Sequence, residues 1–206
     1  MNKRLMSVLL VAGLAGSLNV AAEAMGNADA GKDKAATCAA CHGADGNSSA
    51  GNFPKLAGQG SRYLAKQIND IKSGARKVVE MTGLLDSLNE QDINDISAYY
   101  ASQSVIVAQA KKDLVKEGKD LYRAGNPAKN VAACTACHGP SGAGIALAGF
   151  PALGGQHADY VSTQLKKFRN GERSNDGDTL VMRSIAARLS DREIEALANY
   201  VSGLHL

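Results

Sequence analysis

The sequence contains the pattern Cys-x-x-Cys-His twice. Its residues are Cys38, Cys41 and His42 in the first copy and Cys134, Cys137 and His138 in the second. This is the attachment pattern for c-type haem. The thiols add to the two vinyl groups of the porphyrin, and two intervening residues on a helical turn give the sulfurs the spacing of those vinyls. The adjacent histidine then lies under the iron as its proximal ligand. We therefore expect two covalently attached haem c groups.

Paired cysteines also occur in zinc sites and in thioredoxin-like redox motifs. Zinc ribbons usually separate their cysteine pairs by about 15–20 residues, whereas Cys41 and Cys134 are 93 residues apart. Each pair also carries its own histidine. All four cysteines of the chain belong to the two patterns, so none remains for a structural disulfide. Haem attachment is therefore the favoured interpretation.

The first 24 residues have the organisation of a secretory signal peptide. Lys3 and Arg4 form a basic start, an apolar run follows, and Ala22-Glu23-Ala24 is a small-residue cleavage site. The apolar run is shorter than the roughly 20 residues that a membrane-spanning helix needs. We predict cleavage after Ala24, with cleavage after Ala30 as the alternative, and export of the remaining chain.

The two halves of the chain repeat each other. The haem patterns align at an offset of 96 residues, the Phe-Pro segments that follow them at 97, and Met81 with Met182 at 101. A repeat this long indicates domain duplication, because solenoid units are typically about 20–50 residues long. We predict an N-terminal unit over 25–103, a linker over 104–112 and a C-terminal unit over 113–206.

Each unit has helical periodicity in three segments and no persistent strand pattern, so we predict an all-α fold. The expected helices span 28–40, 61–73 and 90–102 in the first unit and 113–124, 158–170 and 191–202 in the second. Asn89 and Ser190 are suitable N-caps for the last helix of each unit, and Ser190 with Glu193 forms a capping box. Units of this size have limited cores of their own. A buried haem would supply much of the apolar interior.

An iron bound by one histidine either takes a second axial ligand or stays open to small molecules. Met81 and Met182 lie 39 and 44 residues after the histidine of their haem pattern, each before the last expected helix. A single methionine would be interpreted as core filler. Two equivalent methionines in a methionine-poor chain instead favour iron ligation. The alternative ligands, His157 and His205, are expected at the surface.

Two further pairs of residues align between the units. Pro54 and Pro151 follow the haem patterns, and a carbonyl oxygen there would accept the Nδ1–H of the proximal imidazole and fix its ring. The alternative is a simple turn. Arg76 and Arg173 would pair with haem propionates or, in the alternative interpretation, extend into solvent.

The charge of the chain argues against nucleic-acid binding. There are 23 Lys and Arg against 20 Asp and Glu, a formal net charge of +3, and no basic run. The charge is unevenly divided: residues 25–110 hold 8 basic and 9 acidic residues, and residues 111–206 hold 13 and 10. Such asymmetry orients a protein in the field of its partner. We expect the second unit to dock onto an acidic partner.

The ordered set of repeats resembles the di-haem cytochrome c4 family. Besides the haem patterns, the segments that carry the resemblance are 52–59, 149–157 and 175–179 through Met182. It covers nearly the whole chain after the signal peptide and implies two class I cytochrome c domains whose haems exchange electrons. It also implies His42 with Met81 as axial ligands of one iron, and His138 with Met182 as those of the other.

The resemblance further implies a place in a respiratory chain. Members of this family usually work in the bacterial periplasm, often associated with the inner membrane. They pass electrons from the quinol-oxidising cytochrome bc complex toward terminal oxidases, commonly of the cbb3 type. The enzymatic alternatives are a di-haem peroxidase and a sulfur-oxidising dehydrogenase, which need an open or displaceable ligand, or a cysteine ligand. With no spare cysteine and a candidate methionine in each unit, a carrier without enzymatic activity is expected.

Overall fold

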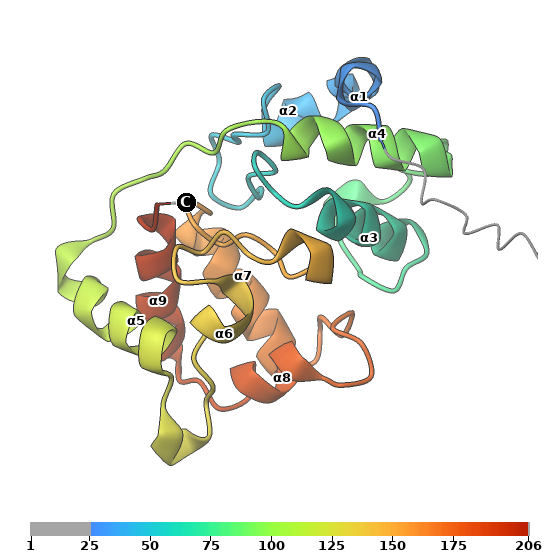
Figure 1. Cartoon of the computed structure of the whole chain (residues 1–206). Helices are drawn as coiled ribbons and strands as arrows, with labels where there is room; N and C mark the ends of the chain where they lie inside the picture. Colours follow the sequence, from blue (N-terminus) through green and yellow to red (C-terminus); the bar gives the residue numbers. More distant parts are fainter. Residues whose placement is uncertain (1–25, 206) are drawn as a thin grey trace, which may run out of the picture.

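The computed structural model describes residues 26–205 (Figure 1). Over this range the chain is helical and contains no β-strand, and its β-type pairing consists of two isolated bridges, Asn126–Val131 and Ile145–Phe150. The predicted all-α class is confirmed. None of the described helices is long and apolar enough to cross a membrane. The predicted signal peptide lies outside the described residues.

The first half of the chain has four helices among its described residues. They are α1 (Ala28–Lys34), α2 (Ala39–His42), α3 (Ser61–Lys72) and α4 (Glu90–Ala101). The single helix predicted over 28–40 is wrong in detail. The chain tightens into a 3-10 turn at Ala35–Thr37, where the Cys38 N–H donates to Ala35 O at 2.9 Å, and a separate short helix follows. This break separates α1, which packs across α4, from the turn that carries the haem pattern.

The described part of the second half has five helices. They are α5 (Lys112–Ala124), α6 (Thr135–His138), α7 (Ala158–Arg169), α8 (Val181–Ala186) and α9 (Asp191–Ser202). The sequence did not predict α8. It has six residues, no side-chain cap, and a left-handed N-cap at Leu180 with φ of 50°. Neither its length nor a capping residue therefore predicts this helix. Met182 is its second residue.

The predicted caps of the last helices are confirmed. The Asn89 side chain accepts the Asp92 N–H at 2.9 Å, and Asp92 accepts the Asn89 N–H at 3.0 Å. Ser190 and Glu193 form the same reciprocal pair before α9. Both motifs satisfy N–H groups that the first turn of a helix leaves without partners. They fix where the last helix of each half begins.

Each half has its own apolar core. The core of the first half contains Ala35, Leu64, Ile96 and Tyr100, and the larger core of the second includes Tyr122, Val161, Ile194, Leu197 and Val201. Between α4 and α5 the chain is extended and runs along both halves. Asn47 Oδ1 accepts the Ile106 N–H at 2.8 Å, and Asn199 Oδ1 accepts the Lys111 N–H at 2.8 Å. The connection is therefore tied to the helices on either side of it.

Candidate haem-binding sites

The two haem patterns occupy equivalent helical turns. In the first half, Cys38 is the N-cap of α2, and the His42 N–H donates to its carbonyl at 3.0 Å. In the second, Cys134 is the N-cap of α6, and the His138 N–H donates to it at 2.9 Å. Residues three apart on a helix lie on one face, so the two sulfurs of each pair face the same way. None of the four cysteines forms a disulfide.

The two candidate proximal histidines are buried and held by the same hydrogen bond. Nδ1 of His42 lies 2.9 Å from Pro54 O, and Nδ1 of His138 lies 2.9 Å from Pro151 O. Because a carbonyl oxygen only accepts, Nδ1 carries the proton, and the lone pair of Nε2 is available to a metal. The predicted role of the two prolines is confirmed. Burial lowers the pKa of both imidazoles against the opposing effect of these bonds, which favours the neutral form that metals bind.

The environment of the thiols argues against the alternative cysteine chemistries. Burial raises the pKa of Cys38, and it raises the pKa of Cys134 to about 11. Redox-active cysteines have lowered pKa values instead. Over residues 26–205, no group of three or more His, Cys, Asp or Glu side chains is arranged to hold a metal ion, whereas structural zinc takes four ligands. Two cysteines on one turn beside an oriented imidazole fit a covalent haem.

Two buried arginines point to bound anions. Arg76 and Arg173 are 9% and 7% exposed, so the solvated alternative is wrong. Their hydrogen-bond partners are the uncharged side chains of Gln67, Tyr160 and Gln164 for Arg76, and of Tyr63, Gln67, Gln164 and Asn175 for Arg173. In the described chain neither guanidinium forms an ion pair. A buried charge without a counter-charge is costly, and haem propionates would supply the missing anions.

The candidate methionines lie in different local structures. Met81 ends the 3-10 turn Val79–Met81, and Met182 lies in α8. Both are half-buried. Exposed apolar side chains adjoin them in sequence, namely Val79 and Leu84 near Met81, and Leu180 and Val181 near Met182. Exposed apolar side chains that recur beside a functional residue indicate a binding surface, here at the same place in both halves.

The two alternative histidine ligands differ in their surroundings. His205 is exposed, as expected. His157 is half-buried rather than at the surface, because it is the N-cap of α7 and faces a loop of the first half. Its Nε2 lies 3.0 Å from Ser48 Oγ and 2.9 Å from Ser48 O. His157 therefore belongs to the contact between the halves.

Sequence reasoning missed the most deeply buried tyrosines. Tyr100 and Tyr122 are 1% and 0% exposed. Tyr122 donates to Gly139 O at 2.7 Å, directly after the second haem pattern. Tyr100 follows Ile96 by one helical turn of α4, and this spacing was the available signal. Both rings pack in the cores next to the cysteine-bearing turns.

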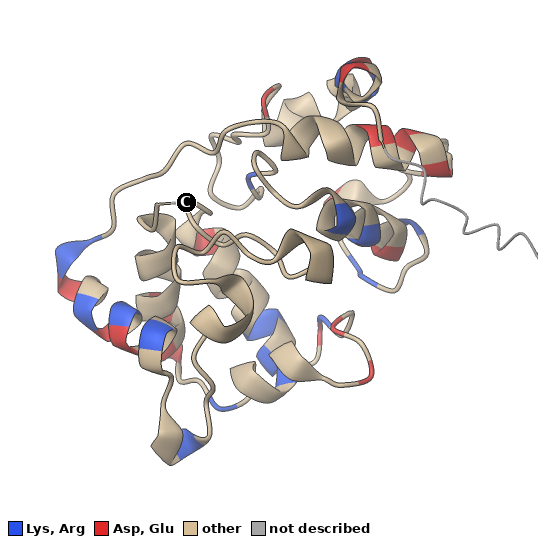
Figure 2. Cartoon of the chain, in the orientation of Figure 1, with Lys and Arg blue, Asp and Glu red and all other residues tan. Residues whose placement is uncertain are grey.

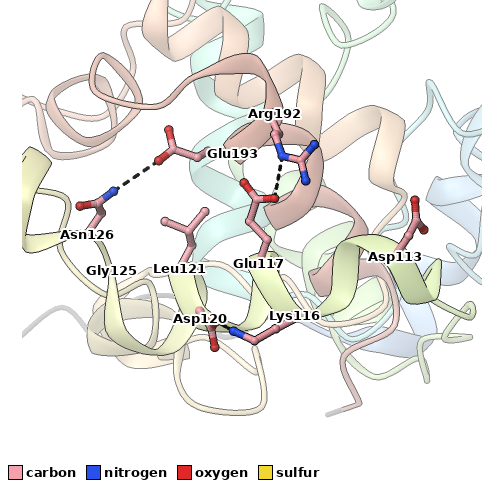
Figure 3. A pocket seen from close by; sticks show the side chains of 9 residues that line it. All are labelled: Asp113, Lys116, Glu117, Asp120, Leu121, Gly125, Asn126, Arg192 and Glu193. Carbon is pink, nitrogen blue, oxygen red and sulfur yellow. Dashed lines mark hydrogen bonds and ion pairs between the residues drawn. The ribbon is translucent and has the colours of Figure 1, made fainter.

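An open groove of about 490 Å³ lies apart from these residues, between α5 and α9 (Figure 3). Its charged side chains are largely paired with one another: Lys116 with Asp120 at 2.7 Å, and Arg192 with Glu117 at 2.9 Å. None of the candidate haem ligands lines it. The groove is a feature of the helix crossing and not part of the site.

Comparisons with known proteins agree with this geometry. The cytochrome c family model matches residues 28–104 and 115–205, one match in each half. Cytochrome c4 of Pseudomonas aeruginosa is 60% identical over 205 residues, which cover 100% of both chains. The crystal structure of reduced recombinant cytochrome c4 from Pseudomonas stutzeri matches with a TM-score of 0.86 at 56% identity, covering 87% of this chain and 100% of that one.

A more distant relative has a different description. A protein of Stutzerimonas stutzeri described as a thiosulfate dehydrogenase electron acceptor is 36% identical over 174 residues, 82% of this chain and 80% of its own. The chain belongs to the cytochrome c4 family of electron-transfer proteins, with two tandem cytochrome c domains that each bind one covalent haem c.

Proposed function

We propose that the protein is a periplasmic one-electron carrier in which a histidine and a methionine bind each iron. His42 and Met81 are the ligands in the N-terminal domain, and His138 and Met182 are those in the C-terminal domain. The observation that carries this proposal is the repeated geometry of the histidines. Each is buried, neutral, and held through Nδ1 by a proline carbonyl, which leaves Nε2 for the iron.

The side chains around each haem have separate tasks in this proposal. The bound haem supplies an iron that accepts and releases one electron. Cys38, Cys41, Cys134 and Cys137 anchor the two porphyrins through thioether bonds. The methionine thioether is a soft ligand that favours the reduced iron and raises the reduction potential. Arg76 and Arg173 neutralise propionates between the two domains, where both guanidinium groups are buried.

The domains are proposed to extend over 25–103 and 113–206, with the linker at 104–112. The family-model matches, 28–104 and 115–205, support this division. So does the absence of helix between α4 and α5. An inter-domain contact built from buried polar side chains of both domains supports a fixed arrangement in which the haems exchange electrons.

The proposed donor is the quinol-oxidising cytochrome bc complex, and the proposed acceptor is a terminal oxidase, commonly of the cbb3 type. The protein would work at the outer face of the inner membrane. Family membership supports this placement. The more distant relative makes a thiosulfate dehydrogenase the alternative donor. Both donors can be mixed with the oxidised protein, and the one that reduces it at rates matching turnover is the physiological class.

Docking is proposed to involve the C-terminal domain. Residues 111–206 carry 13 basic and 10 acidic residues, and Figure 2 shows basic residues on α7 and basic residues alternating with acidic ones along α5. On the first half, acidic residues gather at one end of α4 (Figure 2). Opposite charges steer encounter and raise association rates.

The ligand assignment is tested by replacing the methionines singly. Met81→Ala should lower the potential of the N-terminal haem and open it to carbon monoxide, while the C-terminal haem keeps its wild-type spectrum. Met182→Ala should give the mirrored result. Met25→Ala is the matched control, because Met25 is the other methionine of the first unit after the signal peptide. If Met25→Ala opens a haem, or if neither other variant does, the assignment is wrong.

A further inference from the structure

Two equivalent glutamines reach across the contact between the domains. Gln59 and Gln156 each precede the N-cap of the middle helix of their domain, α3 and α7 respectively. Both are 7% exposed. Each side-chain amide accepts from the N–H of one residue in the opposite domain and donates to the carbonyl of the same residue. The proposed function assigns no role to either glutamine.

In the N-terminal domain, one peptide group connects the proximal histidine to the glutamine of the other domain. The carbonyl of Pro54 accepts from His42 Nδ1 at 2.9 Å. The N–H of the same peptide group, that of Lys55, donates to Gln156 Oε1 at 2.9 Å. Gln156 Nε2 in turn donates to Lys55 O at 2.9 Å. The glutamine therefore fixes the peptide that fixes the imidazole.

The C-terminal domain has the reciprocal arrangement. The carbonyl of Pro151 accepts from His138 Nδ1 at 2.9 Å. The N–H of that peptide group, that of Ala152, donates to Gln59 Oε1 at 2.8 Å, and Gln59 Nε2 donates to Ala152 O at 3.0 Å. The same pair of backbone hydrogen bonds forms in both domains, although the side chains of Lys55 and Ala152 are chemically unrelated.

Hydrogen bonds that share a peptide group polarise one another. An acceptor on the N–H increases the negative charge of the carbonyl oxygen and strengthens its other bond, by about 10–30% per bond. A stronger acceptor on Nδ1–H makes the imidazole a more basic iron ligand. A more basic ligand stabilises the oxidised iron and lowers the reduction potential, since hydrogen bonding around the ligands tunes haem.

We propose that Gln59 and Gln156 are positioning residues, each of which sets the reduction potential of the haem in the opposite domain through the proximal histidine. This inference rests on the proposed histidine ligation. It follows that the packing of the two domains and the redox properties of both haems are coupled. Any change that separates the domains removes both glutamines from their peptides at once.

The test is Gln156→Met, which keeps the length of the side chain and removes both polar atoms. The N-terminal haem should become easier to reduce by about threefold in its equilibrium constant, or about 28 mV at 59 mV per tenfold. The C-terminal haem should keep its potential. Gln59→Met should shift only the C-terminal haem. The crossing of the effect is diagnostic, because a packing defect at Gln156 would disturb the haem of its own domain.

Two controls separate polarisation from loosening of the interface. Ser48→Ala removes the contact of Ser48 Oγ with His157 Nε2 at the same interface and its hydrogen bond to Phe53 O. Neither contact involves the peptide groups that bind the glutamines, so both potentials should stay unchanged. Gln156→Glu retains the acceptor oxygen and adds negative charge, so the N-terminal potential should fall. If Gln156→Met does not fold, the N-terminal potential of Gln156→Glu is the test. A rise in that potential would overturn the proposal.

A second readout follows the histidine itself. In nitrogen-15 NMR, Gln156→Met should shift the Nδ1–H resonance of His42 and speed its exchange with solvent, while His138 is unaffected. An unchanged His42 resonance together with an unchanged N-terminal potential, or a joint shift of both haems, overturns the proposal. A failure of histidine ligation would already be visible in the wild-type spectrum, so the two failures are distinguishable.

Discussion

Gly118→Ala should destabilise the C-terminal domain by about 2 kcal/mol, although alanine is the better helix former. Gly118 lies where α5 crosses α9, and a Cβ there would be 2.1 Å from Ala196 O and 2.6 Å from the Cβ of Tyr200. The nearest obstacle is a backbone carbonyl inside a helix, which cannot rotate away as a side chain does. The two helices must therefore move apart by about 1 Å to reach ordinary contact distances, so the core between them loses its close packing.

The magnitude follows from two opposing effects. Overpacking a well-packed core costs about 1–3 kcal/mol, and the rigid obstacle places this site near the upper value. Replacing glycine by alanine inside a helix stabilises the helix by about 1 kcal/mol. The difference is about 2 kcal/mol.

Guanidinium chloride unfolding, followed by far-ultraviolet circular dichroism and haem absorbance, measures this loss. At an m value of about 4 kcal/mol/M, the midpoint of the C-terminal transition should fall by about 0.5 M. Lys119→Ala is the control on the same helix, because Lys119 is exposed and surface substitutions stay within about 0.5 kcal/mol. If Gly118→Ala unfolds at or above the wild-type midpoint, the gain in helix propensity outweighs the close approach of α5 and α9, and the expected destabilisation is refuted.

Three further predictions follow from buried and charged groups. Arg173→Met removes a positive charge from between the domains, so at least one haem potential should fall in a redox titration; potentials equal to the wild type would argue against propionate pairing. The Asn27 N–H, Lys34 and Gln91 hold the pKa of Asp95 at about 2, below the roughly 3.9 of an unfolded chain. The stability that the ionised Asp95 gives the folded protein should therefore be present above about pH 4 and lost as the pH falls toward 2. Asp95→Asn should unfold more easily than wild type at pH 7 but not at pH 2. An equal loss of stability at both pH values would contradict this assignment. Electron transfer to an acidic partner should slow with added salt in stopped-flow measurements, and a rate indifferent to salt would exclude docking through the basic second half.

Features with a local signal were predictable from the sequence. The Cys-x-x-Cys-His turns, the capping residues Asn89 and Ser190, and the last helix Asp191–Ser202 depend on residues close together in the chain. The hydrogen bond from each proximal histidine to a proline carbonyl was predictable too, because the haem pattern and the Phe-Pro segment recur in the same order in both halves. Duplication supplied an internal comparison that one domain alone would lack.

Features that depend on packing between the domains were not predictable. The burial of Arg76 and Arg173, the inward position of His157, and the exchange of glutamine side chains arise only when the two halves face each other. The short helix that carries Met182 begins at a left-handed residue without a cap. Nothing in the local sequence predicts such a start, because Leu180 is not one of the residue types that cap helices and the β-branched Val181 favours strands over helices.

We propose that a histidine and a methionine close both irons, and that the closed irons make the protein a carrier rather than a catalyst. Absorption spectroscopy of the purified protein, oxidised, reduced, and reduced under carbon monoxide, tests this ligation. With a histidine and a methionine on each iron, we expect the weak red charge-transfer band of methionine-bound ferric haem and a reduced spectrum that carbon monoxide leaves almost unchanged. Rapid and complete carbon monoxide binding by the wild-type reduced protein would contradict it.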